Sequence, residues 1–290
     1  MSASTLSVLL GLVAAILFAV GNQFSRIGLR FADARTATTV QILVGAGVYW
    51  LIAPFYLEGW YWVSAAMPWL IAAGLLRPIL SANLGMLGTR LLGPTVSSTL
   101  SATAPLFGVT FGLVILAEAL SLAGAIGTAC IVGAVVLLST QGKADRAWPM
   151  FALLLPIGAA LIRSVTHGFA KIALETVPDP YFVALVTYSV SVPLALGERW
   201  WRLGTPRVQV APGGLRWLVG MALAYALAVL ALNTALLKGT LVVVSPIVAC
   251  SPVFTLLLGR FVFNEQMLNV RAALAVGLVV PGVILIGLDG

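Results

Sequence analysis

Charged residues are scarce in this sequence. Lysine, arginine, aspartate and glutamate together make up 9% of its 290 residues, whereas hydrophobic residues make up 61%. A soluble domain carries about a quarter charged residues, and a chain of this length with so few charges cannot cover itself with a polar surface. The composition therefore excludes a soluble globular protein and predicts a protein that crosses a membrane several times.

Residues that hold metals or form disulfide bridges are also few. The single histidine excludes clusters such as HExxH, and the two cysteines, Cys130 and Cys250, lie inside apolar runs without the spacing of a metal site or a disulfide framework. No GxxxxGK[ST] loop for ATP phosphates is present either. We therefore expect no metal, no cofactor and no direct coupling to ATP.

The net charge of +7 comes without any dense run of basic residues. A scattered excess of this kind does not predict nucleic-acid binding. In a membrane protein it is explained by topology signals and by contact with lipid headgroups. We therefore expect membrane lipid as a partner and no nucleic acid.

The apolar runs predict ten membrane-spanning helices, because a span needs about 20 apolar residues. Strands are excluded, because the runs are too long and lack the alternation of a lipid-facing barrel. The predicted spans are roughly residues 5–25, 36–57, 66–88, 93–116, 121–140, 149–170, 181–197, 215–236, 240–262 and 270–288. A polar connector at 141–146, QGKADR, separates the fifth span from the sixth.

A block of sequence occurs twice, once in each half of the chain. Residues 101–120 read SATAPLFGVTFGLVILAEAL, and residues 248–267 read VACSPVFTLLLGRFVFNEQM. Each copy has a proline, a phenylalanine two residues later, a glycine seven later and a glutamate thirteen later: Pro105, Phe107, Gly112 and Glu118, then Pro252, Phe254, Gly259 and Glu265. A chain that repeats itself near its midpoint is predicted to consist of two copies of one unit, here residues 1–142 and 147–290.

Each unit contains five predicted spans. Because five is odd, the second unit must enter the membrane from the opposite side, which makes the units inverted repeats. The predicted fold class is therefore an all-α polytopic membrane protein with ten transmembrane helices arranged as two inverted five-helix repeats. In membrane proteins such halves often enclose a substrate site.

These features resemble the drug/metabolite transporter superfamily, and within it the EamA-type ten-helix transporters. The resemblance rests on the ten spans in two halves and on the Pro-x-Phe…Gly…Glu block. In each half this block follows a stretch rich in small residues. The resemblance covers essentially the whole chain. It implies a secondary transporter in the inner or plasma membrane that works by alternating access and is no enzyme. We expect it to export a small metabolite, such as an amino acid or another compound with a carboxylate or phosphate.

Two other function classes are weighed against the transporter. An intramembrane enzyme would need a nucleophile–base pair or a metal cluster at membrane depth, and one histidine with no mid-span aspartate or glutamate argues against it. A non-transporting helical scaffold would not need cations in mid-membrane. Arg77 and Arg163, which lie there, argue against the scaffold.

The residues expected to bind substrate are polar groups inside the spans. An ionisable group in mid-membrane costs about 2.5–3.5 kcal/mol on insertion scales, so each needs a reason. Arg77 and Arg163 lie deepest, one in each half, and His167 follows Arg163 by one helical turn. We predict that these three, with Asn22 and Tyr225, line one central cavity that binds the anionic group of the substrate. Histidine changes charge near neutral pH and could link transport to protons.

Each of these residues also has a structural interpretation. Arg77 could be satisfied by backbone carbonyls freed near Pro78, since proline removes a backbone donor. Asn22 could hold helices together by hydrogen bonds instead of touching substrate. Glu118 and Glu265 end their helices, and each is predicted to cap the N-terminus of the helix that follows.

The distribution of basic residues predicts the orientation in the membrane. Twelve fall in the connectors after odd-numbered spans: Arg26, Arg30, Arg35, Arg90, Lys143, Arg146, Arg199, Arg202, Arg207, Arg216, Arg260 and Arg271. The connectors after even-numbered spans hold two, Lys171 and Lys238. The positive-inside rule places the twelve in the cytoplasm and both termini outside, whereas ten-span members of the resembled family are generally described with cytoplasmic termini. We follow the charge count.

Overall fold

The computed structural model describes residues 3–55, 57–77, 79–92, 94–139, 150–261 and 270–287. Within these ranges every regular element is a helix. The α-helices are α1 (Ala3–Gly28), α2 (Ala34–Ile52), α3 (Met67–Leu76), α4 (Ile79–Leu92), α5 (Pro94–Ser101), α6 (Ala104–Val114), α7 (Leu122–Ser139), α8 (Met150–Thr176), α9 (Pro180–Leu203), α10 (Leu215–Lys238), α11 (Leu241–Val248), α12 (Ser251–Phe261) and α13 (Val270–Gly287), and two short 3-10 helices are η1 (Ala53–Phe55) and η2 (Gly59–Val63).

These helices form ten apolar segments. Eight are long and apolar enough to cross a membrane: Ser4–Gly28, Ala34–Phe55, Met67–Leu92, Val96–Val114, Phe151–Thr176, Pro180–Leu203, Leu215–Lys238 and Leu241–Phe261. Leu122–Leu138 and Ala273–Gly287 are shorter apolar helices. The ten segments follow the ten predicted spans in order, so the all-α fold with ten helices is confirmed.

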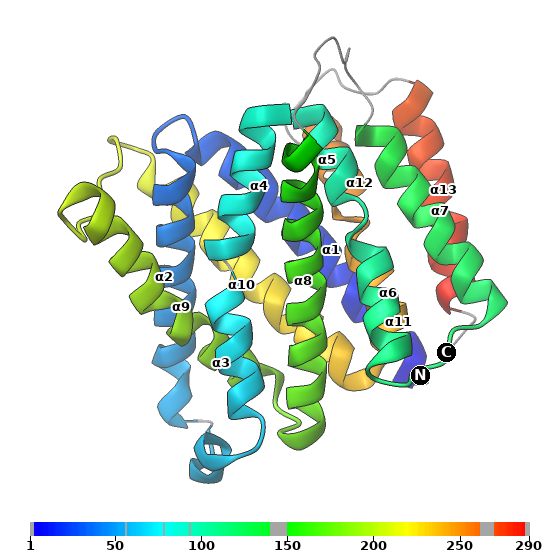
Figure 1. Cartoon of the computed structure of the whole chain (residues 1–290), viewed down its shortest axis with the longest axis horizontal. Coiled ribbons are helices and arrows are strands. Elements are labelled where there is room, and N and C mark those ends of the chain that lie inside the picture. The colour runs from blue at the N-terminus through cyan, green and yellow to red at the C-terminus, as the bar shows by residue number, and fades with distance from the viewer. Residues whose placement is uncertain are drawn as a thin grey trace.

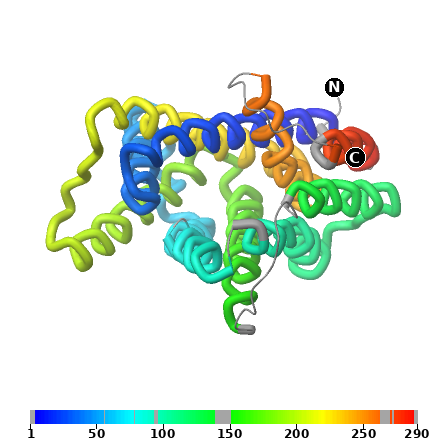
Figure 2. Tube along the Cα trace, turned by 90° about the horizontal axis from the view of Figure 1, so that it is seen from above, coloured from blue at the N-terminus to red at the C-terminus, as the bar shows by residue number. Residues whose placement is uncertain are grey.

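The two halves of the chain enter the helical layer from opposite ends (Figure 1). The N- and C-termini lie at one end, which we call the terminal end, whereas α8 begins at the other. We call that other end the basic end, because the connectors from α1 to α2 and from α9 to α10 lie there with their arginines. Seen from above, α1 runs along α10, and α7 lies beside α13 (Figure 2). Both pairs join a helix of the first half to one of the second.

Three of the segments are broken in the middle. The chain between α3 and α4 is extended at Arg77, with φ −120° and ψ 145°. The break between α5 and α6 comes just before Pro105, and the break between α11 and α12 comes just before Pro252. The repeated prolines therefore sit at matching breaks, as expected from a residue that lacks a backbone donor.

Glu118 does cap a helix, but not the one predicted. Its Oε1 accepts a hydrogen bond from the backbone N–H of Leu241 at 2.8 Å, and its Oε2 accepts one from Val242 at 2.9 Å. These amides begin α11, in the other half of the chain, where the N-cap residue Thr240 makes no side-chain capping bond. The expected cap of the following helix is wrong, because α6 and α11 pack together and bring this N-terminus to the carboxylate. Glu265 lies outside the described residues.

The backbone around Glu118 is shaped for this contact. Ala117 has a φ of 51°, a left-handed conformation that turns the chain after α6. Gly112 leaves the necessary room, since a Cβ there would lie 2.6 Å from Oε2 of Glu118. At the same end of the molecule, Lys171 Nζ donates to the backbone oxygens of Leu236 and Gly239 at the end of α10, both at 2.9 Å. The N-terminus of α11 and the C-terminus of α10 are thus satisfied by side chains from the α6–α7 connector and from α8.

The orientation predicted from the basic residues can be tested by cysteine labelling. Gln209 is exposed in the α9–α10 connector, whereas Gly204 has a φ of 64° and suits no other residue well. With Cys130 and Cys250 replaced, Gln209→Cys should resist a membrane-impermeant maleimide in intact cells. The control Gly59→Cys, where a new Cβ meets nothing within 4 Å, should react readily because it lies at the terminal end. The reverse pattern would place the termini in the cytoplasm.

Candidate functional site

A cavity of about 60 Å³ lies among α2, α3, α8, α9 and α10. Its lining residues are Gln41, Ala73, Arg77, Thr166, His167, Ala170, Val183, Thr187, Tyr188, Ser191, Val229, Leu232 and Asn233. Arg77 lies near the middle of the apolar segment Met67–Leu92, so the cavity is at mid-membrane depth. Both halves of the chain contribute to it.

Arg77 and His167 meet in this cavity. Arg77 Nη1 lies 3.0 Å from His167 Nε2. A guanidinium only donates hydrogen bonds, so His167 must accept through Nε2 and carry its proton on Nδ1, which makes the ring neutral in this arrangement. The cation thus has a neutral partner, and no aspartate or glutamate is among the described residues that line the cavity.

The broken segment positions Arg77. The carbonyl of Gly74 has no helical donor, because the residue four positions on is a proline. The Ser191 hydroxyl lies 3.0 Å from this oxygen, 2.8 Å from that of Arg77 and 2.9 Å from that of Thr187, so its single proton can satisfy one of them at a time. The Arg77 guanidinium faces the cavity. Among the described residues, no backbone carbonyl accepts a hydrogen bond from the Arg77 guanidinium, whose side-chain partner there is His167.

The wall facing Arg77 is made by polar side chains of α9 and its neighbours. Tyr188 reaches the cavity from α9 and Gln41 from α2. The ring of Tyr188 packs directly on α2, since a Cβ on Gly45 would lie 2.4 Å from the ring. Asn233, on α10, donates through Nδ2 to the backbone oxygen of Pro180 at 3.2 Å, which leaves its amide oxygen as an acceptor. The site therefore offers donors and acceptors around one half-buried cation.

Arg163 lies close to this cavity without lining it. Its Nη2 donates to the backbone oxygen of Ser101 at 3.5 Å, at the break between α5 and α6. Its Nε is buried with no hydrogen-bond partner in the described part of the chain. The neighbouring Ser164 hydroxyl bonds the backbone oxygen of Ala104 at 2.6 Å. Arg163 is thus a second cation with incomplete hydrogen bonding, one turn before His167 on α8 and outside the cavity lining.

Asn22 and Tyr225 form a different cluster. The Tyr225 hydroxyl donates to Oδ1 of Asn22 at 2.6 Å, and Nδ2 of Asn22 donates to the Thr255 hydroxyl at 3.2 Å. Gln23 Nε2 donates to the backbone oxygen of Thr255 at 2.7 Å. The cluster joins α1, α10 and α12. A Cβ on Gly21 would lie 2.6 Å from the Tyr225 ring, so this glycine lets α1 and α10 approach closely.

The structure brings two of the five residues predicted to bind substrate into this cavity. Arg77 and His167 line it, whereas Arg163, Asn22 and Tyr225 are absent from its described lining. The direct packing of α1 against α10 turns the Asn22–Tyr225 pair into a bond between helices. The sequence prediction did not include the polar residues of α9. These residues could have been found from the sequence, because Thr187 and Ser191 are four residues apart in an otherwise apolar span and therefore lie on one helix face.

The comparison with protein families decides the identity of this fold. The sequence model of the EamA-like transporter family matches residues 5–140 and 150–288, one match in each half. The chain belongs to the EamA-like transporter family. It is therefore an integral membrane protein of a family that transports small molecules.

A solved structure supports the same architecture. The structure titled "Crystal structure of protein" is similar to this EamA-like chain with a TM-score of 0.80 and 16% sequence identity, over 96% of this chain and 95% of the other. At this identity the likeness shows the fold alone. No curated protein sequence matches the chain.

The cavity of this EamA-like protein is closed toward the terminal end. A cluster of buried side chains from α3, α8, α9, α10 and α11 fills that end of the bundle, and Leu70, Phe182, Leu236 and Leu241 are among its fully buried members. Aromatic rings extend it, since Phe182 contacts Tyr61 at 5.2 Å between ring centroids. The side chains of the cluster are aliphatic and aromatic, so they exclude water from this end.

Proposed function

We propose that the protein is a secondary transporter for a small metabolite with a carboxylate or phosphate group, and that Arg77 binds this group. The observation that supports the proposal is the half-buried guanidinium at mid-depth whose hydrogen-bond partner is a neutral histidine. A charge in this position is costly without a counter-charge. A substrate anion would supply it and gain a charge-assisted hydrogen bond.

The inverted halves suggest how such a substrate moves. Arg77 belongs to the first half and His167 to the second, so a substrate between them contacts both halves at once. In our proposal the halves rock about this site and open it to each side in turn, as in other transporters built from inverted repeats. We further propose that the protein lies in the inner or plasma membrane and that net transport is export.

The proposal is tested first by binding. Purified protein is screened by thermal shift against small anionic, neutral and cationic metabolites, because a ligand that binds the folded state raises the melting temperature by mass action. Hits are then assayed for flux into proteoliposomes, with a membrane potential or a pH gradient imposed in turn. Anionic compounds should stabilise the protein and be transported. Stabilisation by neutral or cationic compounds alone would contradict the role of Arg77.

The Arg77–His167 pair predicts a proton linkage. When a substrate anion takes the Arg77 donors, Nε2 of His167 loses its donor and becomes free to accept a proton. His167→Gln should therefore flatten the pH dependence of transport between about pH 5 and 8, with a smaller effect on substrate affinity, since a glutamine oxygen still accepts from Arg77. Flux at several pH values in wild-type and variant liposomes measures this. Because the chain has a single histidine, an unchanged pH profile in the variant would exclude this linkage.

A further inference from the structure

The break at Arg77 opens a second cavity between α4 and α9. Before the break, α3 packs against α9; after it, α4 packs on α8 and touches α9 little. The resulting wedge has a volume of about 90 Å³. Its lining residues are Asp33, Arg35, Thr38, Thr39, Ile79, Ala82, Asn83, Met86, Ala195, Glu198, Arg199, Arg202 and Leu203. We call this cavity the wedge cavity.

The wedge cavity lies in line with the central cavity. On α2, Thr38 lines the wedge and Gln41 the central cavity, less than one helical turn apart; on α9, Ala195 lines the wedge and Ser191 the central cavity, about one turn apart. Its other members Arg35, Arg202 and Leu203 are exposed at the basic end. The wedge therefore leads from the basic end toward Arg77, while the terminal end is closed by its apolar cluster.

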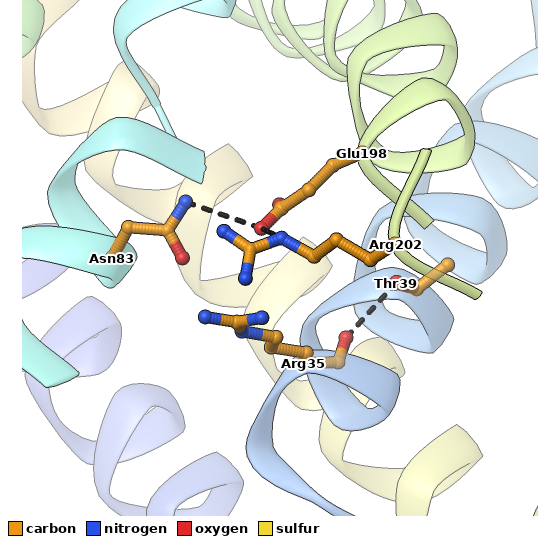
Figure 3. A network of polar contacts seen from close by, with 5 residues as sticks. All are labelled: Arg35, Thr39, Asn83, Glu198 and Arg202. Atoms are coloured by element: carbon orange, nitrogen blue, oxygen red, sulfur yellow. Dashed lines mark hydrogen bonds and ion pairs between the residues drawn. The ribbon is translucent and has the colours of Figure 1, made fainter. Parts of the chain in front are cut away.

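The charges in the wedge are not balanced. Arg202 Nε pairs with Oε1 of Glu198 at 3.2 Å, and the same oxygen accepts from Asn83 Nδ2 at 3.4 Å (Figure 3). The Arg35 side chain, by contrast, makes no hydrogen bond or ion pair in the described part of the chain, and only its backbone oxygen is bonded, by Thr39 at 2.9 Å. Figure 3 shows the guanidinium groups of Arg35 and Arg202 pointing into the same space. The described lining thus carries three guanidinium groups, of Arg35, Arg199 and Arg202, and two carboxylates, of Asp33 and Glu198.

The remaining charged residues of the wedge already have structural partners. Arg199 is buried and donates to the backbone oxygen of Arg207 at 2.7 Å and to the Thr36 hydroxyl at 3.0 Å. Asp33 accepts from the backbone N–H of Thr36 at 2.8 Å as the cap of α2. This hydrogen bonding lowers the pKa of the Asp33 carboxyl, so it stays ionised at neutral pH. The charge of Arg35 also contributes to this lowering, so Asp33 balances part of the Arg35 charge, while Arg199 adds a third guanidinium to the wedge.

We propose that the wedge cavity is a second anion-binding site, in which Arg35 and Arg202 hold a soluble carboxylate or phosphate before it moves on to Arg77. Binding in the wedge is argued from the wedge alone, whereas the onward movement to Arg77 rests on the proposed function as an anion transporter. Two guanidinium groups directed at one space can bind one carboxylate or phosphate by paired hydrogen bonds. Apolar side chains of the lining, Ile79 and Met86 on α4 and Leu203 on α9, are placed to contact the organic part of such a compound.

The test uses charged thiol reagents and needs no knowledge of the substrate. Thr38→Cys and, separately, Ala82→Cys place a thiol in the wedge of a protein whose Cys130 and Cys250 are replaced, in nanodiscs of neutral phosphatidylcholine. The rate with the anionic reagent methanethiosulfonate ethylsulfonate is divided by the rate with its cationic trimethylammonium analogue. Arg35→Gln should lower this ratio by about sevenfold, the effect of one unit charge at about 7 Å in water on two reagents of opposite sign. Arg216→Gln, an exposed cation of the same end outside the wedge, should leave it unchanged.

Two further arms identify the anion. Inorganic phosphate at constant ionic strength should slow labelling by the anionic reagent when Arg35 is present and not in Arg35→Gln. Labelling that is slowed by adding phosphatidylglycerol to the nanodisc, and not by phosphate, would assign the site to lipid headgroups and overturn the proposal. An equal ratio in wild type and Arg35→Gln at both thiol positions would overturn it as well. Neither result touches the central site, whose test is transport by Arg77 variants, so the two proposals fail separately.

Discussion

Replacing Arg77 with glutamine is expected to lower the apparent affinity for substrate by about 10- to 100-fold. A hydrogen bond to a charged group contributes about 1.5–3 kcal/mol, and each 1.4 kcal/mol changes an equilibrium constant tenfold. Glutamine still offers donors that His167 can accept from, so the variant keeps the contact between α3 and α8 and loses only the charge. Transport into proteoliposomes at several substrate concentrations measures the change.

The same substitution should not lower the stability of the ligand-free protein. The guanidinium is half-buried beside a neutral partner, so its removal relieves part of a desolvation cost that the empty site does not repay. A melting temperature equal to or above that of wild type, together with the lost affinity, would separate a binding role from a structural one. Arg90→Gln, at the exposed end of α4, is the matched control and should transport normally. Normal transport by Arg77→Gln would refute the proposed site.

The second large effect is expected at Glu118. Glu118→Ala removes the acceptor of two backbone N–H groups that begin α11, on Leu241 and Val242, which are 0% and 1% exposed. Leaving a buried amide without a partner costs about 1–3 kcal/mol. Because this carboxylate comes from the other half of the chain, the variant should unfold at a distinctly lower temperature.

The controls for Glu118 come from the same chain. Glu118→Gln keeps one acceptor oxygen and should lose less stability than the alanine variant. Glu175→Ala removes an exposed carboxylate near the terminal end of α8 and should leave the melting temperature unchanged. Thermal unfolding in one detergent or nanodisc type, followed by circular dichroism, compares the four proteins. Equal melting temperatures for Glu118→Ala and wild type would show that α11 does not depend on this cap.

The architecture was predictable from the sequence because its signals are local or repeated. A run of about 20 apolar residues has few alternatives to a membrane span, and the repeated block around Pro105 and Pro252 marked the two halves and the matching helix breaks. The depth of Arg77 in its span was also local information. Each of these inferences depends on residues that are close together in the chain, or on the comparison of two short segments of the sequence.

The site was only partly predictable, because a residue's depth does not give the direction in which it faces. Asn22 and Tyr225 are as deep as expected, yet the close approach of α1 and α10 pairs them with each other. The partners of Glu118 lie more than a hundred residues away in the sequence, and its capping role was assigned to the wrong helix for that reason. The polar residues of α9 could not be assigned to the site from the sequence, because their role depends on the break at Arg77, which packs against them in the fold.

The apolar cluster at the terminal end has an electrical consequence. In the pathway proposed above, which enters by the wedge cavity at the basic end, the layer that contains Leu70, Phe182 and Leu236 forms the barrier on the terminal side. Narrow regions walled by apolar side chains expel water, and protons and inorganic ions need a chain of water or polar groups to pass. In that pathway the protein would stand open at the basic end without discharging the ion gradients across the membrane in which it sits.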